Sequence, residues 1–265
     1  MSKHQALDTL GRSGNPIIRS SAFQESSTSG ERMTLEGAVN KTGILLFLTV
    51  FSAAISWNLQ GPFMSLVSTI GVLTGVIAAI STFGFYFFFI GWIVEPRPYR
   101  APKTAPIYAI GMGFMIGIIS QQAEAMFPGI VIQAVSLTFF VAASLLLAYK
   151  TGIIRPTQNF VLMIFAATLG IFLTYFCSFI ISLITGSSFS MFTDETGSTS
   201  WISIGISLFV VAIAALNLVL DFDIIEQADE QGAPKYMEWF GAMALMATLI
   251  WLYIEILRLL MKLRR

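Results

Sequence analysis

Long apolar runs separated by short polar segments are the dominant pattern along the chain. A transmembrane helix needs about 20 apolar residues to cross roughly 30 Å of hydrocarbon, and several runs have about that length. Because every backbone group in hydrocarbon must bond internally, the pattern predicts an all-α polytopic membrane protein, a seven-transmembrane-helix bundle. The expected spans are 43–59, 64–94, 105–121, 130–149, 160–184, 201–220 and 239–263. The second run is too long for one perpendicular helix, so we expect it to tilt, kink or protrude.

The first 32 residues are polar, rich in serine and of mixed charge, and they lack the apolar core of a signal peptide. We expect a disordered cytoplasmic tail at 1–32 and a transmembrane domain at 33–265.

Lysine and arginine follow the alternation expected of cytoplasmic loops. They occur in the tail, between spans two and three, between spans four and five and between spans six and seven, but not in the other three loops. This distribution predicts a cytoplasmic N-terminus. The C-terminus, RLLMKLRR, breaks the rule, because seven spans place it outside. Either the last helix spans despite its charges, which we favour, or the last segment is re-entrant.

Composition narrows the function classes. The 265 residues are 55% hydrophobic and 11% charged with a formal net charge of zero, so no nucleic-acid partner is suggested. The single cysteine, Cys177, excludes a disulfide framework and a cysteine metal site. No nucleotide motif, zinc spacing or catalytic triad is present, so we expect neither an enzyme nor a cofactor. The bilayer is the expected partner, and other membrane proteins stay open as partners.

Ionisable residues within the apolar runs are the candidate site. An intramembrane carboxylate is costly and is a functional hypothesis by default. Asp221 closes the sixth span, and Asn217 lies one turn before it on the same face. Asp223 points about 200° away from Asp221 and is an ambiguous supporting residue. We expect Asp223, Glu226, Asp229 and Glu230 to form a solvated acidic loop, and an alternative makes Asp221 a solvated end group as well.

Glu255 is the sharper candidate because apolar residues fill the six positions before it. It lies ten residues from the chain end, about 15 Å along a helix, which places it near mid-membrane. We therefore expect Glu255 to face the interior and the last helix to be central in the bundle. The alternative is an intrahelical ion pair with Arg258, three residues later.

Two glycine motifs predict close helix contacts. GVLTG at 71–75 and GFMIG at 113–117 both have the GxxxG spacing, which lets two backbones approach. The motif indicates packing rather than function.

The segments LVLDFDII and KYMEWFGAMALMATLIWLYIEILRLL, with the seven-span layout, resemble the transmembrane Bax inhibitor motif family. The resemblance covers roughly 33–265 and is strongest to a bacterial, YccA-like branch with a long polar N-terminal tail, which implies the bacterial inner membrane. Asp221 stands where the family has its signature aspartate in helix six. Glu255 stands where helix seven has its second acid, with glutamate in place of aspartate.

The resemblance implies a pH-sensitive calcium leak channel whose two carboxylates, Asp221 and Glu255, form a gating pair. An arginine at the end of helix two latches to the pair in relatives, and Arg97 and Arg100 are the candidates here. Two close carboxylates in low dielectric share a proton, which makes the pair a pH sensor. With Asn217 they offer few oxygens, so calcium, the transported ion, would bind weakly.

Two other functions compete with the channel. An intramembrane aspartyl protease also uses two carboxylates, but its Gly-x-Gly-Asp signature is missing. The family's link to stress and cell-death suppression keeps open a membrane interaction protein that modulates a membrane protease or stress and cell-death machinery.

Overall fold

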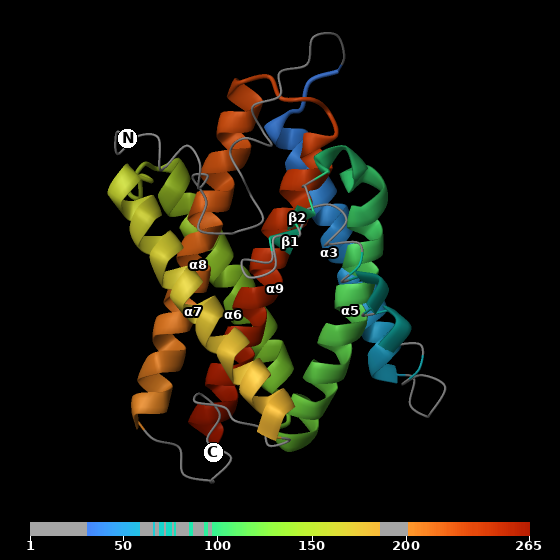
Figure 1. Cartoon of the computed structure of the whole chain (residues 1–265), viewed down its shortest axis with the longest axis vertical. Coiled ribbons are helices and arrows are strands. Elements are labelled where there is room, and N and C mark those ends of the chain that lie inside the picture. The colour runs from blue at the N-terminus through green and yellow to red at the C-terminus, as the bar shows by residue number, and fades with distance from the viewer. Residues whose placement is uncertain are drawn as a thin grey trace.

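The computed structural model describes residues 31–58, 97–185 and 201–265, and scattered positions between 66 and 94. Six long helices lie in these ranges (Figure 1), and each is long and apolar enough to cross a membrane. They are α3 (Leu35–Asn58), α5 (Ala101–Met126), α6 (Ile130–Lys150), α7 (Gln158–Thr185), α8 (Trp201–Glu230) and α9 (Met237–Arg264). The short 3₁₀ helix η1 (Pro98–Arg100) precedes α5. The all-α polytopic class is confirmed.

The end of the predicted second span is not helical. Strands β1 (Phe85–Tyr86) and β2 (Ile93–Val94) pair antiparallel, with Phe85 opposite Val94. Their aromatic and β-branched side chains favour extended backbone, and hydropathy alone does not distinguish the two conformations. The prediction of one span to residue 94 is therefore wrong at this end. Most of 64–94 lies outside the described residues, as does the predicted tail apart from Glu31 and Arg32.

Helices α3 and α5 run side by side in the same direction. Thr49 donates a hydrogen bond to the carbonyl of Ala109, and further along Ser56 donates to that of Phe114. Two parallel neighbours require the chain between them to return to its starting end. Gly71 and Gly75 fit such a return, because they contact α5 in reverse order. A Cβ at Gly71 would lie 2.6 Å from the Phe114 ring, and one at Gly75 would lie 3.0 Å from the Gly111 Cα.

Helix α9 is the centre of the bundle, as predicted. It packs against α3, α5, α6 and α8, most of its residues are buried, and it runs through the middle of Figure 1. It is one unbroken helix from Met237 to Arg264, so the re-entrant alternative for the last segment is wrong.

The cations at the C-terminal end of α9 are held by polar groups of neighbouring segments. Lys262 donates to the hydroxyls of Ser203 and Ser207 at 2.7 and 2.9 Å, near the start of α8. Arg264 donates to the carbonyl of Pro128 at 3.0 Å and to Gln133 at 2.8 Å. These contacts explain how a basic terminus is placed at the end of the bundle where the loops lack lysine and arginine.

The opposite end is closed by a clasp between the start of α3 and the α8–α9 turn. The Glu238 carboxylate accepts hydrogen bonds from the backbone N–H and the hydroxyl of Thr34, at 3.0 and 3.2 Å. Asp229 accepts one from the backbone of Leu35 at 3.2 Å. Both carboxylates bind free N–H groups at a helix N-terminus, where the helix dipole favours negative charge.

Candidate functional site

Glu255 lies in the interior, only 2% exposed, on the central helix. Its carboxylate accepts hydrogen bonds from Tyr175 at 3.0 Å, from the Trp251 indole at 3.3 Å and from Arg258 at 3.1 Å. Trp251 and Arg258 are one turn before and after Glu255, so the helical repeat alone places them on its face. Tyr175 reaches the cluster from α7.

Arg258 completes the cluster by contacting two of its members. It forms an ion pair with Glu255 at 3.1 Å and donates to the Tyr175 hydroxyl at 2.6 Å. Its guanidinium also lies 5.3 Å from the centre of the Tyr175 ring. The intrahelical ion pair, the alternative at the sequence level, is thus present. It supplies the opposite charge that a buried carboxylate needs in low dielectric.

Asp221 is fully buried on α8, so its interpretation as a solvated end group is wrong. Asn217, one turn earlier and 1% exposed, donates to the Thr168 hydroxyl of α7 at 2.9 Å and to the Ile213 carbonyl at 2.8 Å. Among the described residues, no group donates a hydrogen bond to the Asn217 Oδ1. This second polar centre therefore links α8 to α7.

The register of the α8–α9 hairpin sets the two acids at different depths. Gly241 lies against Ile225, and Lys262 bonds Ser207. The two helices are therefore antiparallel, and the residue numbers of two facing positions add up to about 467. Asp221 is then level with Met246, nine residues or about 13 Å along α9 from Glu255. A proton shared directly between them would need α9 to slide by about two and a half turns. The register does not favour direct contact between Asp221 and Glu255, and their role as a gating pair stays a prediction.

Asp223 and Glu226 face away from Asp221, as the helical angle predicts. Asp223 accepts hydrogen bonds from Gln227 at 2.6 Å and from Tyr149 at 3.3 Å, and Glu226 also accepts one from Tyr149. Because α8 continues to Glu230, the expectation of a solvated acidic loop is wrong. The segment is helical, and part of it anchors α6 through Tyr149.

The two candidate latch arginines lie before α5. Arg97 is exposed at the start of η1, and Arg100 has its guanidinium 5.8 Å from the Tyr99 ring. Thr49 contacts both Ala109 of α5 and Met246 of α9, so these two residues lie at the same level of the bundle. Arg100 lies nine residues before Ala109, about 13 Å along α5 from that level. Their role as a latch stays a prediction, whereas the cation that binds Glu255 is Arg258.

Sequence reasoning missed Tyr175, Trp251 and Thr168 as members of these centres. The helical repeat carries a signal for Trp251, which precedes Glu255 by four residues. Tyr175 and Thr168 belong to α7, and no local pattern relates them to residues 80 and 49 positions later. Among the described residues no group of three or more histidine, cysteine, aspartate or glutamate side chains could hold a metal ion.

The spanning helices and buried acids define a polytopic helical membrane protein with ionisable groups in its interior. Residues 15–265 match the family model described as Bax inhibitor 1 like, and the chain belongs to that family. No curated protein and no solved structure matches the chain. The family predicted from helices six and seven is thereby confirmed, and the bacterial branch stays a prediction.

Proposed function

We propose that this protein is a pH-sensitive cation leak channel with calcium as the transported ion, controlled by Asp221 and Glu255. We place it in a bacterial inner membrane with the N-terminus in the cytoplasm. The observation that carries the proposal is the burial of two carboxylates on neighbouring helices, one of them on the central helix. Intramembrane acids of this kind mark ion or proton paths.

In the proposal the acids act in series. Asp221 and Glu255 each lie nine residues before the end of their own helix, so they fall in opposite halves of the hairpin. The arrangement around Glu255 represents a closed state, because Arg258 occupies the carboxylate that a passing cation would use. Few oxygen ligands are available at Asp221 or at Glu255, so calcium would bind weakly at either site. Weak binding suits passage of the ion rather than its storage.

The proposal also assigns a direction to the pH dependence. A protonated Glu255 is neutral and loses its ion pair with Arg258, so the link from α9 to Tyr175 on α7 weakens. Acidification should therefore raise the flux. Glu255→Gln imitates the protonated acid, and it should give a raised flux that no longer depends on pH.

Calcium flux into proteoliposomes tests the proposal. Purified protein is reconstituted around a calcium-sensitive dye, and entry is followed from mildly acidic to mildly alkaline pH. We expect several-fold faster entry for the wild type at acidic pH, a pH-independent high rate for Glu255→Gln and a strongly reduced rate for Asp221→Asn. Glu36→Gln, at an exposed position in the first turn of α3, is the matched control and should behave as the wild type.

A flux that ignores both substitutions would defeat the channel proposal. That result would favour the interaction protein, whose activity would be sought in the degradation of membrane substrates in cells. Proteolysis by the purified protein that both variants abolish would instead identify an enzyme.

A further inference from the structure

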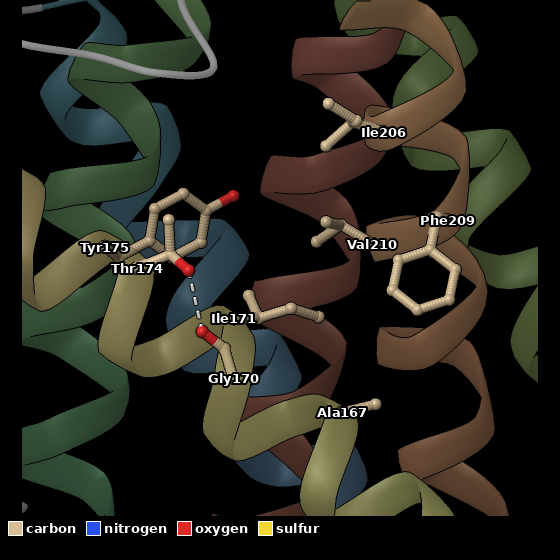
Figure 2. A pocket seen from close by; sticks show the side chains of 8 residues that line it. All are labelled: Ala167, Gly170, Ile171, Thr174, Tyr175, Ile206, Phe209 and Val210. Carbon is tan, nitrogen blue, oxygen red and sulfur yellow. Dashed lines mark hydrogen bonds between the residues drawn. The ribbon is translucent and has the colours of Figure 1, made fainter. Parts of the chain in front are cut away.

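A groove of about 400 Å³ separates α7 from α8 on the outside of the bundle (Figure 2). Ala167, Gly170 and Tyr175 line it from α7, and Ile206 and Val210 line it from α8. Figure 2 shows the residues of α7 and α8 facing one another across the gap, with α9 behind. The lining is almost entirely apolar, so water is a poor occupant.

The groove exists because α7 is attached to the bundle at separated points. Below the groove, Val161 and Ile164 pack against Leu220 of α8, and Thr168 is bonded to Asn217 of α8. At its upper end Tyr175 bonds the Glu255–Arg258 pair. Between these points Gly170 contributes no side chain, and a Cβ built on it would meet nothing within 4 Å.

The surroundings of the groove are those of a lipid-facing surface. Phe172 and Leu173 on α7 and Leu208 and Phe209 on α8 are large apolar side chains that lie exposed beside it. In a chain whose helices span the bilayer, such side chains contact acyl chains. The volume of the groove is too small for a partner helix. A helix about 10 Å across would fill 400 Å³ with only about one turn.

The polar groups lie at one end of the groove. Thr174 and Tyr175 mark the end nearest the start of α8, and the Arg258 guanidinium, with its side chain 29% exposed, lies behind Tyr175. Trp201, 87% exposed, begins α8 only five residues before Ile206, about 8 Å away. Exposed tryptophan marks the membrane–water interface.

We propose that one acyl chain of a membrane phospholipid occupies the groove between α7 and α8, with its headgroup at the end of the groove nearest Trp201. The lipid belongs to the leaflet at the N-terminal end of α8. This site does not depend on ion conduction, and a protein that conducts no cation would still bind the lipid here.

Photo-crosslinking tests the site directly. The protein is reconstituted in vesicles of phosphatidylcholine and phosphatidylglycerol that contain a trace of phospholipid with a diazirine in its acyl chain. After irradiation the labelled peptides are mapped by mass spectrometry. We expect labelling concentrated on 167–175 and 206–210, several-fold above that of other exposed apolar surfaces such as Phe47 and Phe51 on α3.

Gly170→Leu should fill the groove and reduce that labelling several-fold. Gly43→Leu is the matched control, because Gly43 is an exposed helical glycine of α3 that also has nothing within 4 Å of its Cβ position. It should leave the labelling unchanged. Leucine is a better helix former than glycine, so both variants should fold.

Equal labelling of all exposed apolar faces would show an ordinary lipid shell and overturn the proposal. Undiminished labelling in Gly170→Leu would overturn it too, as would chemical crosslinks from the groove to another protein helix. The wild-type labelling pattern decides the question by itself should a variant fail to fold.

Discussion

Glu255 shows how a charge is kept inside a membrane bundle. Its carboxylate is 2% exposed and is surrounded by the phenol of Tyr175, the indole of Trp251 and the guanidinium of Arg258. Hydrogen bonds and opposite charge together offset the desolvation of the acid. The ion pair therefore contributes little net stability, but the loss of one partner alone should lower the free energy of unfolding strongly.

A double-mutant cycle on Glu255 and Arg258 tests this coupling. Arg258→Met leaves a buried carboxylate without its cation and should lower the free energy of unfolding by about 2–3 kcal/mol, less than the 3–5 typical of fully buried pairs, because Arg258 is partly exposed. Adding Glu255→Gln should recover most of that loss. Reversible unfolding in mixed micelles of dodecyl sulfate gives both values.

The size of the coupling energy distinguishes this ion pair from a packing contact. If Arg258→Met and Glu255→Gln have independent, additive effects, the ion pair contributes nothing and Arg258 acts only through its contacts with Tyr175.

Sequence reasoning identified Asp221 and Glu255 as buried acids, because a charge inside an apolar run is visible without a structure. It did not identify their partners across helices. Thr168 binds Asn217 from 49 residues away, and Tyr175 binds Glu255 from 80 residues away. The depth of Asp221 relative to Glu255 could not be predicted from the sequence either, since it depends on the register of the α8–α9 hairpin.

Among the elements, hydropathy located the helices better than their ends. The predicted first span begins at 43, but α3 begins at Leu35, and the sixth was expected to end at 220, but α8 ends at Glu230. Hydropathy follows the hydrocarbon layer, whereas a helix continues while its polar end groups find partners. Asp223 and Asp229 are two acids with such partners, on α6 and α3.

The two GxxxG motifs were correctly predicted to mark close helix contacts. Gly75 approaches Gly111, and Gly117 approaches α3, where a Cβ would lie 2.6 Å from the Ala53 carbonyl oxygen and 2.9 Å from the Ser56 Cβ. The spacing alone does not name the partner helix, so α3 was not foreseen as the neighbour of Gly117.

Glycine-to-alanine substitutions should have opposite effects on α5 and α7. Gly117→Ala inserts a methyl group against the α3 backbone and should cost about 1–3 kcal/mol through overpacking. Gly170→Ala meets open space and should gain about 0.5–1 kcal/mol from helix propensity. Unfolding in mixed micelles measures both values, and a Gly117→Ala variant as stable as the wild type would contradict the assigned α3–α5 contact.

For the whole molecule, the direction of each helix determines the topology. Helices α3 and α5 run in the same direction, and α6, α7, α8 and α9 then alternate in direction, so α9 runs in the same direction as α3. The start of α3 and the end of α9 consequently lie at opposite ends of the bundle, as Figure 1 shows. The lysine and arginine pattern gave the same result from the sequence, apart from the basic C-terminus.

The contacts of the C-terminal cations remove the conflict with the charge rule. Lys262 is bonded to the two serines of α8, and Arg264 is bonded to the α5–α6 turn and α6, so the bundle itself satisfies both cations. Charge counting assumes that such groups are free to interact with the membrane surface. Here the protein determines where they lie.

Labelling of single cysteines by a membrane-impermeant maleimide in intact cells tests the topology. Because Cys177 is the only native cysteine, Cys177→Ala provides a background without thiols. Arg265→Cys should be labelled from outside, and Glu31→Cys should be labelled only after the membrane is permeabilised. Lys150→Cys, at the end of α6, should behave as Glu31→Cys, because Tyr149 beside it bonds the same end of α8 that holds the start of α3.

Labelling of all three positions from the same side would contradict seven crossings. Labelling of Glu31→Cys and Lys150→Cys alone from outside would keep the fold and reverse the proposed orientation.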